Sequence, residues 1–260
     1  MPTTNGCLTN FAEQKLLDHL LRKTTWTLPT CYFGLWTGSP TETGAGGAEV
    51  TTPGTDGYNR IAVGTAGSCK FNAASGRATT SNVDVIFGPS TGGPWTDAEY
   101  WVMFDASTGG NMIAYGQLTD TSIGTDDSYK IAAGDIDLTW GTTTQTKWVD
   151  SVVHALLDHL TGRTAYTAPD LWLALYEGDP HGAGVETTTA GTNGYARQDV
   201  DAAMAAASGG SISNGSEITF GPATADWGTV DYCAFMSALT AGSVMGGGAL
   251  GASKAIDFYK

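Results

Sequence analysis

Hydrophobic residues recur at helical spacing in two stretches of the chain. Within residues 11–23, four leucines fall on one face of a helix, and residues 152–160 carry a matching stripe of valines and leucines. Asn10 and Glu13 have the spacing of a capping box at the start of the first helix, and Gly162 is suited to end the second. The pattern therefore predicts two short amphipathic helices, each with one apolar face to bury.

Three pairs of short segments have the pattern of β-strands. They are 31–36 with 171–176, 83–87 with 217–220, and 100–104 with 232–236. The first and third pairs are apolar without alternation, which indicates strands covered on both faces, whereas the middle pair alternates and turns one face inward. Asp56-Gly57 and Asn193-Gly194 are strong signals for tight turns. The pattern predicts a mainly β protein with antiparallel β-sandwich-like domains, each with one N-terminal helix laid over a sheet or at one end.

The two helices head two copies of one sequence. Leu-Leu-Asp-His-Leu at 16–20 recurs at 156–160, and the ordered match continues downstream. Later matched blocks are Gly-Tyr-x-Arg at 57–60 and 194–197, Phe-Gly-Pro at 87–89 and 220–222, and Trp95 with Trp227. The offset falls from 140 (156 − 16) to 132 (227 − 95), so insertions lie between the matched blocks, as loops vary around a retained core. We predict a first domain over residues 1–140, a polar linker at 141–147 and a second domain over 148–260.

The ends of the two copies also look alike. Ile-Asp-Leu at 136–138 and Ile-Asp-Phe at 256–258 have the appearance of matching closing strands, with the loop before the second one lost. A strand so close to the end of the sequence is expected at a sheet edge, where unpaired backbone groups invite a neighbouring chain. We therefore expect Ile256 and Phe258 to contact an adjacent subunit.

The charge and cysteine content exclude several function classes. Acidic residues outnumber basic ones by 26 to 12, and the excess is shared by both halves, so the chain repels phosphate backbones and nucleic-acid binding is not expected. No stretch approaches the roughly 20 apolar residues that span a bilayer, so no membrane partner is expected. The four scattered cysteines match neither a zinc site nor a disulfide framework, which predicts reduced thiols and synthesis in a cytoplasm.

Two Asp-His pairs, Asp18-His19 and Asp158-His159, are the strongest candidates for catalytic chemistry. A histidine beside a carboxylate can serve as a general base or a metal ligand. Adjacent residues on a helix point about 100° apart, however, and no activated nucleophile accompanies either pair. A structural role at a polar helix edge or in a helix–sheet hydrogen bond is favoured. An acidic loop at 177–181 has no matching acids in the first copy. We therefore expect no enzyme, no cofactor and no metal.

Aromatic residues and arginines at matched positions are candidates for a protein interface. The pairs are Trp26 with Tyr166, Tyr58 with Tyr195, and Arg60 with Arg197. Tyrosine, tryptophan and arginine are frequent interface anchors. For the Gly-Tyr-x-Arg motif, an arginine stem packed along a tyrosine ring inside the copy is favoured over an interface role. For Trp95 and Trp227, a core position at the end of the sandwich is favoured over an exposed platform for a sugar.

The ordered motifs resemble a family of tailed-bacteriophage proteins described as phage tail fibre proteins. The motifs are Leu-Leu-Asp-His-Leu at 16–20, Thr-Trp-Thr-x-Pro at 25–29, Gly-x-Pro at 38–40, Gly-Tyr-x-Arg at 57–60, Phe-Gly-Pro at 87–89, Trp95 and Gly-x-Leu at 116–118. Phe-Asp-Ala at 104–106 fits as well, whereas the second copy has Met-Ser-Ala at 236–238. The resemblance covers nearly the whole chain, once per copy, and implies a small β-rich domain that is duplicated here.

The resemblance implies a structural protein of a bacteriophage virion that is made in the bacterial host cytoplasm. Its expected partners are other capsid or tail proteins and the chain itself. Two positions on the particle exterior stay open: a tail or tail-fibre component, and a capsid decoration protein. The alternative from another class is a carbohydrate-binding module that contacts the host cell surface, with a host glycan as its ligand.

Overall fold

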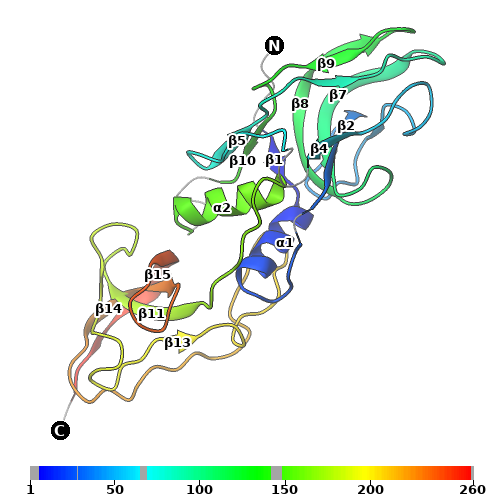
Figure 1. The fold of residues 1–260 in the computed structure, drawn as a ribbon. Helices are drawn as coiled ribbons and strands as arrows, with labels where there is room; N and C mark the ends of the chain where they lie inside the picture. The colour runs from blue at the N-terminus through cyan, green and yellow to red at the C-terminus, as the bar shows by residue number, and fades with distance from the viewer. Residues whose placement is uncertain (1–5, 28, 65–68, 142–147, 259–260) are drawn as a thin grey trace.

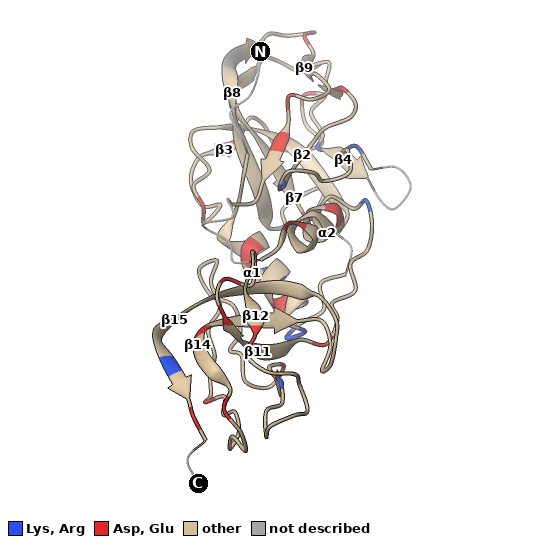
Figure 2. Ribbon diagram, turned by 90° about the vertical axis from the view of Figure 1, so that its left-hand side faces the viewer, with Lys and Arg blue, Asp and Glu red and all other residues tan. Residues whose placement is uncertain are grey.

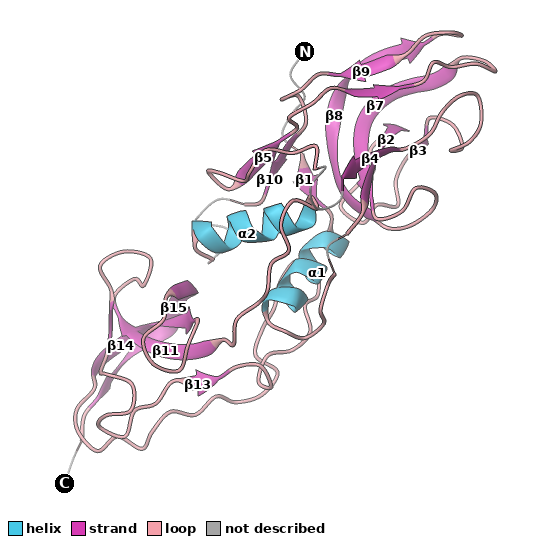
Figure 3. Cartoon of the chain, viewed as in Figure 1, coloured by secondary structure: helices cyan, strands magenta, loops and turns pink. Residues whose placement is uncertain are grey.

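The computed structural model describes residues 6–27, 29–64, 69–141 and 148–258 of the chain. Within these residues the protein is mainly β, with two helices and several antiparallel sheets, and the two copies lie end to end (Figures 1 and 3). The predicted mainly β, sandwich-like fold class is confirmed. Of the predicted linker, residues 142–147 lie outside the described residues.

Both predicted helices are present as α1 (Asn10–Leu20) and α2 (Asp150–Leu160). The cap of α1 is Thr9 rather than the predicted Asn10, because Thr9 still has an extended backbone and its hydroxyl accepts a hydrogen bond from the Ala12 N–H at 3.4 Å. After α2, Gly162 adopts a φ of 76° and stops the helix as predicted.

The first copy is built on a six-stranded antiparallel sheet in the order β1-β8-β7-β2-β3, with β4 also paired to β2. The strands are β1 (Cys7–Leu8), β2 (Cys31–Thr37), β3 (Ala48–Glu49), β4 (Ile61–Gly64), β7 (Trp95–Phe104) and β8 (Met112–Ile123). Two small sheets complete this copy: β5 (Ala78–Thr80) pairs with β10 (Asp137–Thr139), and β6 (Val85–Phe87) pairs with β9 (Tyr129–Ile131).

The second copy repeats the main sheet in the order β12-β11-β14-β15, with β13 also paired to β11. The strands are β11 (Trp172–Glu177), β12 (Val185–Glu186), β13 (Gln198–Asp199), β14 (Gly228–Met236) and β15 (Val244–Ile256). The register is conserved, since Leu35 of β2 faces Trp101 and the matched Leu175 faces Cys233. The predicted turns also recur, with positive φ at Asp56-Gly57 and at Asn193-Gly194.

Two predictions about the second copy are wrong. Residues 217–220 form no strand, whereas their counterpart β6 is paired with β9 in the first copy. Ile256 pairs with Gly228 at the end of β15, as Ile123 closes β8 in the first copy, so 256–258 does not correspond to 136–138. The second copy therefore has no counterpart of β9 and β10 among the described residues.

The two copies share one hydrophobic core. The helices lie between the main sheets of the two copies (Figure 1), and the largest cluster of buried apolar residues contains residues of both copies. Two smaller clusters each lie within one copy. Helix α1 packs on β8 of its own copy, whereas α2 packs on β5 of the first copy. Leu17 of α1 lines a pocket together with Met204 and Phe235 of the second copy. Each helix therefore helps to join the copies as well as to cover its own sheet.

Acidic side chains are spread over both copies rather than gathered in one place (Figure 2). In the part of the chain that the structure describes, neither helix is both long enough and apolar enough to cross a membrane. All four cysteines carry free thiols.

Candidate functional site

Arg60 of the Gly-Tyr-x-Arg motif lies at the centre of a buried polar cluster. Its Nε and one terminal nitrogen each donate to a carboxylate oxygen of Glu49 at 2.9 Å. Its other terminal nitrogen donates to the carbonyl oxygens of Ala106 and Gly109, at 2.8 and 2.7 Å, in the β7–β8 turn. The guanidinium therefore ties β3 to the hairpin turn, and its charge is neutralised by a two-point ion pair.

Tyr58 completes this cluster. Its hydroxyl donates to Glu49 Oε1 at 2.8 Å and accepts a hydrogen bond from the Leu35 N–H at 2.9 Å. Its ring meets Trp95 edge to face with the centroids 5.2 Å apart. Burial raises the pKa of the Tyr58 hydroxyl, so it stays protonated and serves as a fixed donor.

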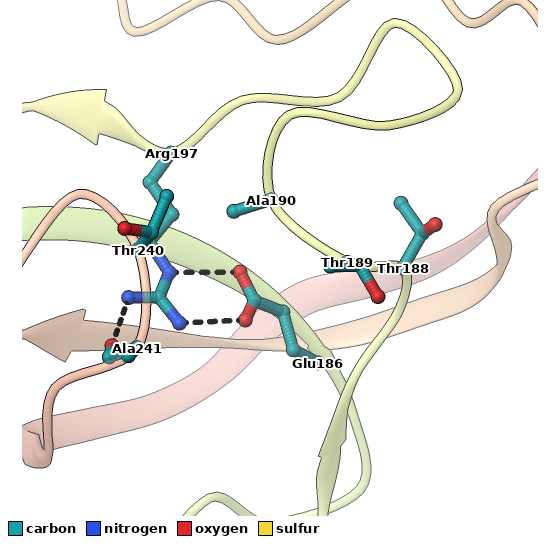
Figure 4. A pocket seen from close by; sticks show the side chains of 7 residues that line it. All are labelled: Glu186, Thr188, Thr189, Ala190, Arg197, Thr240 and Ala241. Carbon is teal, nitrogen blue, oxygen red and sulfur yellow. Dashed lines mark hydrogen bonds and ion pairs between the residues drawn. The ribbon is translucent and has the colours of Figure 1, made fainter.

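The second copy contains the same cluster. Arg197 forms a two-point ion pair with Glu186, at 2.9 and 2.7 Å, and donates to the carbonyl oxygen of Ala241 (Figure 4). It also donates to the carbonyl oxygen of Ala238. Tyr195 donates to Glu186 Oε1 at 2.9 Å. The pocket beside this ion pair is small, about 270 Å³, and its other walls are threonines and alanines. In both copies the Gly-Tyr-x-Arg motif thus builds one structural unit.

The four candidate interface residues of the Gly-Tyr-x-Arg motifs do not lie on the surface. Tyr58, Arg60, Tyr195 and Arg197 are all buried, and their polar groups are satisfied inside their own copy. This favours the internal-packing alternative. Sequence reasoning missed the glutamate partners, although in both copies a glutamate precedes the tyrosine by nine positions.

The two tryptophans that follow the Phe-Gly-Pro motifs are core residues. Trp95 and Trp227 are each 4% exposed, and their indole N–H groups donate to the carbonyl oxygens of Asp56 and Asn193, at 3.0 and 2.9 Å. Neither ring is available as a platform for a sugar.

The Asp-His pairs lie where the two copies meet. The rings of His19 and His159 stack at 4.7 Å between centroids. Nε2 of His19 lies 2.9 Å from the Tyr166 carbonyl oxygen, and Nε2 of His159 lies 2.8 Å from the Trp26 carbonyl oxygen. Each histidine thus contacts the backbone of the other copy, and the two contacts are equivalent when the copies are exchanged.

The second ring nitrogen fixes the protonation state of each histidine. Nδ1 of His19 accepts from the Trp26 N–H and Nδ1 of His159 accepts from the Tyr166 N–H, both at 3.1 Å. A backbone N–H only donates, so both rings are neutral and carry their proton on Nε2. Burial, with the neighbouring His19, lowers the pKa of His159 to about 4. A ring held in this state is a structural link between the copies.

The aspartates of the same pairs also bind across the interface. Asp18 accepts a hydrogen bond from the Ala207 N–H at 2.7 Å, and Asp158 accepts one from the Ala74 N–H at 2.9 Å. The favoured structural role of the Asp-His pairs is therefore what the geometry shows, although its location between the copies was not foreseen. In the described residues, no group of three or more histidine, cysteine and acidic side chains is placed to hold a metal ion.

The remaining candidate contact residues have different surroundings. Trp26 and Tyr166 are half-buried at the junction of the copies, where their backbones bind the two histidines. Ile256 is half-buried and Phe258 is 39% exposed at the end of β15. The structure therefore brings Trp26 and Tyr166 together and leaves Ile256 and Phe258 far from them in the second copy.

The family of the chain follows from a comparison with protein-family models. The model described as podophage GP4 fiber I protein gp80 matches the chain twice, over residues 7–139 and 147–258. The chain belongs to this family. The predicted relationship to phage tail fibre proteins and the duplication are confirmed, and this fibre protein is a structural component of a phage particle. No curated protein matches its sequence.

Proposed function

We propose that this fibre protein is a non-enzymatic connector on the exterior of the particle, which binds other virion proteins through the outward surfaces of its two joined copies. The match of both copies to a fibre family carries this proposal. The joined copies form a single body with two similar surfaces, and such a body can bridge two neighbouring sites or replace a homodimer.

The use of the polar side chains supports a role without catalysis. The histidines and aspartates that could serve as general bases are occupied by contacts between the copies. The buried Tyr-Arg-Glu clusters are occupied by contacts within each copy. A general base must reach the proton that it removes. The acceptor nitrogen of each histidine is already used by a backbone N–H, and each aspartate accepts a backbone N–H of the other copy.

The position in the particle is tested by counting the protein in purified particles. We expect quantitative mass spectrometry to find a small number of chains per tail, and particles that lack the gene to lose fibre density in electron micrographs. A number comparable with that of the capsid protein would indicate capsid decoration instead. Specific binding on a glycan array would favour a carbohydrate-binding module, and absence from particles would refute a structural role.

A further inference from the structure

One side of the first copy is closed by residues 124–140, which follow the long β7–β8 hairpin. In this segment β9 pairs with β6 and β10 pairs with β5. Its apolar side chains Ile131, Ile136 and Leu138 are 3%, 0% and 0% exposed. The segment thus contributes two edge strands and three core residues to the first copy.

The second copy contains counterparts of β5 and β6, but the described residues contain no counterpart of the segment that pairs with them. The isolated bridge between Phe71 and Ser81 recurs between Met204 and Asn214, an offset of 133, so residues 211–213 match β5 and 218–220 match β6. No strand of the described residues pairs with either stretch. Two stretches whose counterparts are paired strands in the first copy are therefore without a strand partner in the second.

Apolar positions beside these two stretches are more exposed than their counterparts in the first copy. A groove of about 670 Å³ is lined by Leu175, Ile212, Ile218, Phe220 and Leu250, among others. The counterparts of these five residues are Leu35, Thr79, Val85, Phe87 and Leu118, all of which are buried. In contrast, the groove residues are half-buried or exposed, and Leu250 is 36% exposed. An apolar groove beside backbone segments that have no strand partner is an arrangement that can accept an added strand.

The charge at the groove specifies the occupant further. In the first copy Lys130 of the closing segment donates to Asp84 at 3.1 Å, at the start of β6. The matched position in the second copy is Glu217, which is exposed and lines the groove. An occupant that binds in the same register therefore carries a basic residue beside its first apolar residue.

We propose that this groove binds an extended segment of another virion protein, which adds strands to 211–213 and 218–220. The segment carries aliphatic residues at the spacing of Ile131, Ile136 and Leu138, with a basic residue before the first. The inference rests on the proposed function only for the class of partner. Because the test needs only the purified chain and a synthetic peptide, its failure would leave the fibre role intact.

The direct test uses the full chain and a synthetic peptide with the sequence of residues 126–140. We expect saturable binding by calorimetry, with protection of the amides of 211–220 from hydrogen exchange. A control peptide with Ile131→Asp, Ile136→Asp and Leu138→Asp is expected to bind at least tenfold more weakly. No binding, equal binding of the two peptides, or protection elsewhere on the chain would overturn the proposal.

A charge exchange tests the register. The Glu217→Lys chain is expected to bind the peptide at least fivefold more weakly, and the peptide with Lys130→Glu is expected to restore binding to this variant. Because Glu217 is exposed, the variant is expected to fold. If Glu217→Lys leaves the affinity unchanged, the proposed register is wrong.

A fusion gives an independent measurement. Placing the sequence of 124–140 directly after Ile256 is expected to fill the groove from within the chain, raise the unfolding temperature and abolish binding of the free peptide. Unchanged peptide binding would contradict the proposal. A chain that dimerises through this groove, with the peptide dissociating the dimer, would replace the virion partner with a second copy of the chain.

Discussion

At the scale of single residues, the same chemistry is repeated at matched positions. Arg60 and Arg197 are buried with side chains 3% and 5% exposed, and each is held by one glutamate and two carbonyl oxygens. A buried guanidinium is tolerated only when its donors are satisfied, because removing a charge from water is costly. The glutamates are therefore as important as the arginines that the sequence motif displays.

Glu186→Ala is expected to destabilise the protein by about 3–5 kcal/mol, because it leaves the Arg197 charge buried without its partner. The free energy of unfolding in urea measures this loss. Lys130→Ala is the control, since it removes an ion pair with more than 40% of each side chain exposed and should change stability by about 1 kcal/mol or less. Equal effects of the two substitutions would contradict the role assigned to Glu186.

The stacked histidines predict a dependence of stability on pH. The pKa of His159 is lowered from its usual 6.5 to about 4 in the folded protein, so between these values the unfolded chain binds a proton that the folded chain does not. This contribution to stability is complete above pH 6.5 and is lost as the pH falls toward 4.

The pH dependence is tested by measuring the free energy of unfolding in urea between pH 4 and 7 for the protein and for His159→Asn. Asparagine keeps a hydrogen-bond acceptor near the Nδ1 position. We expect the variant to be less stable at pH 7 by about 1–3 kcal/mol, from the lost bond to Trp26, and to show a weaker decline with acid. His181→Asn, in an exposed loop, is expected to keep the decline. If His159→Asn leaves the slope of stability against pH unchanged, protonation of His159 does not cause the loss of stability in acid.

At the scale of elements, the second copy ends differently from the first. Strand β15 is the edge of its sheet, and residues 249–255 at its far end are exposed. Its pairing with β14 holds Ile256 opposite Gly228, and the Phe258 N–H donates to Asp226. The expectation that Ile256 and Phe258 contact a neighbouring subunit stays a prediction.

Deleting residues 252–260 is expected to reduce incorporation into particles more than it reduces stability, because it removes the open end of the edge strand rather than core residues. Particle content by mass spectrometry and unfolding temperature give the two quantities. Deletion of 259–260 alone serves as the control. Normal incorporation of the longer deletion would show that this edge faces solvent in the particle.

The elements that the sequence predicted well are those with local signals. The helices, the Asp-Gly and Asn-Gly turns and the apolar strands follow from periodicity and backbone preference alone. The two wrong strand predictions concern features that depend on pairing with residues distant in the chain. Residues 217–220 alternate like a strand, yet a strand also requires a partner strand to pair with. Residues 136–138 and 256–258 have similar sequences, but they occupy different positions in the sheets of their copies.

The candidate site was harder to predict for the same reason. The Tyr-x-Arg pattern is the same in sequence whether the two side chains contact a partner or pack inside their own copy. The structure shows the internal role, because the arginines pair with Glu49 and Glu186. The Asp-His pairs were correctly taken as structural. Their contacts join residues more than 130 positions apart, which a single sequence does not reveal.

At the scale of the whole molecule, the duplication has produced an internal pair. Asp18 and His19 of the first copy bind the second copy as Asp158 and His159 bind the first, and the apolar cores are continuous. An interface in which the same residues serve both sides is the geometry of a two-fold homodimer. The largest apolar cluster therefore belongs to both copies.

Separating the copies tests this view. We expect residues 1–141 and 148–260, co-expressed as two chains, to form a one-to-one complex by light scattering, and residues 1–141 alone to self-associate, because α1 otherwise exposes part of its apolar face. Asp18→Ala together with His19→Ala should weaken both associations. Two fragments that remain folded, separate monomers would contradict a shared core.

A high-resolution cryo-electron microscopy reconstruction of the purified particle tests the central claim most directly, namely that the chain is a joined pair of copies acting as a structural part of the fibre. We expect density for both copies at the fibre, in contact through α1 and α2 with the His19–His159 stack between them. Copies that are separated in the particle, or density for the chain absent from the fibre, would contradict this account.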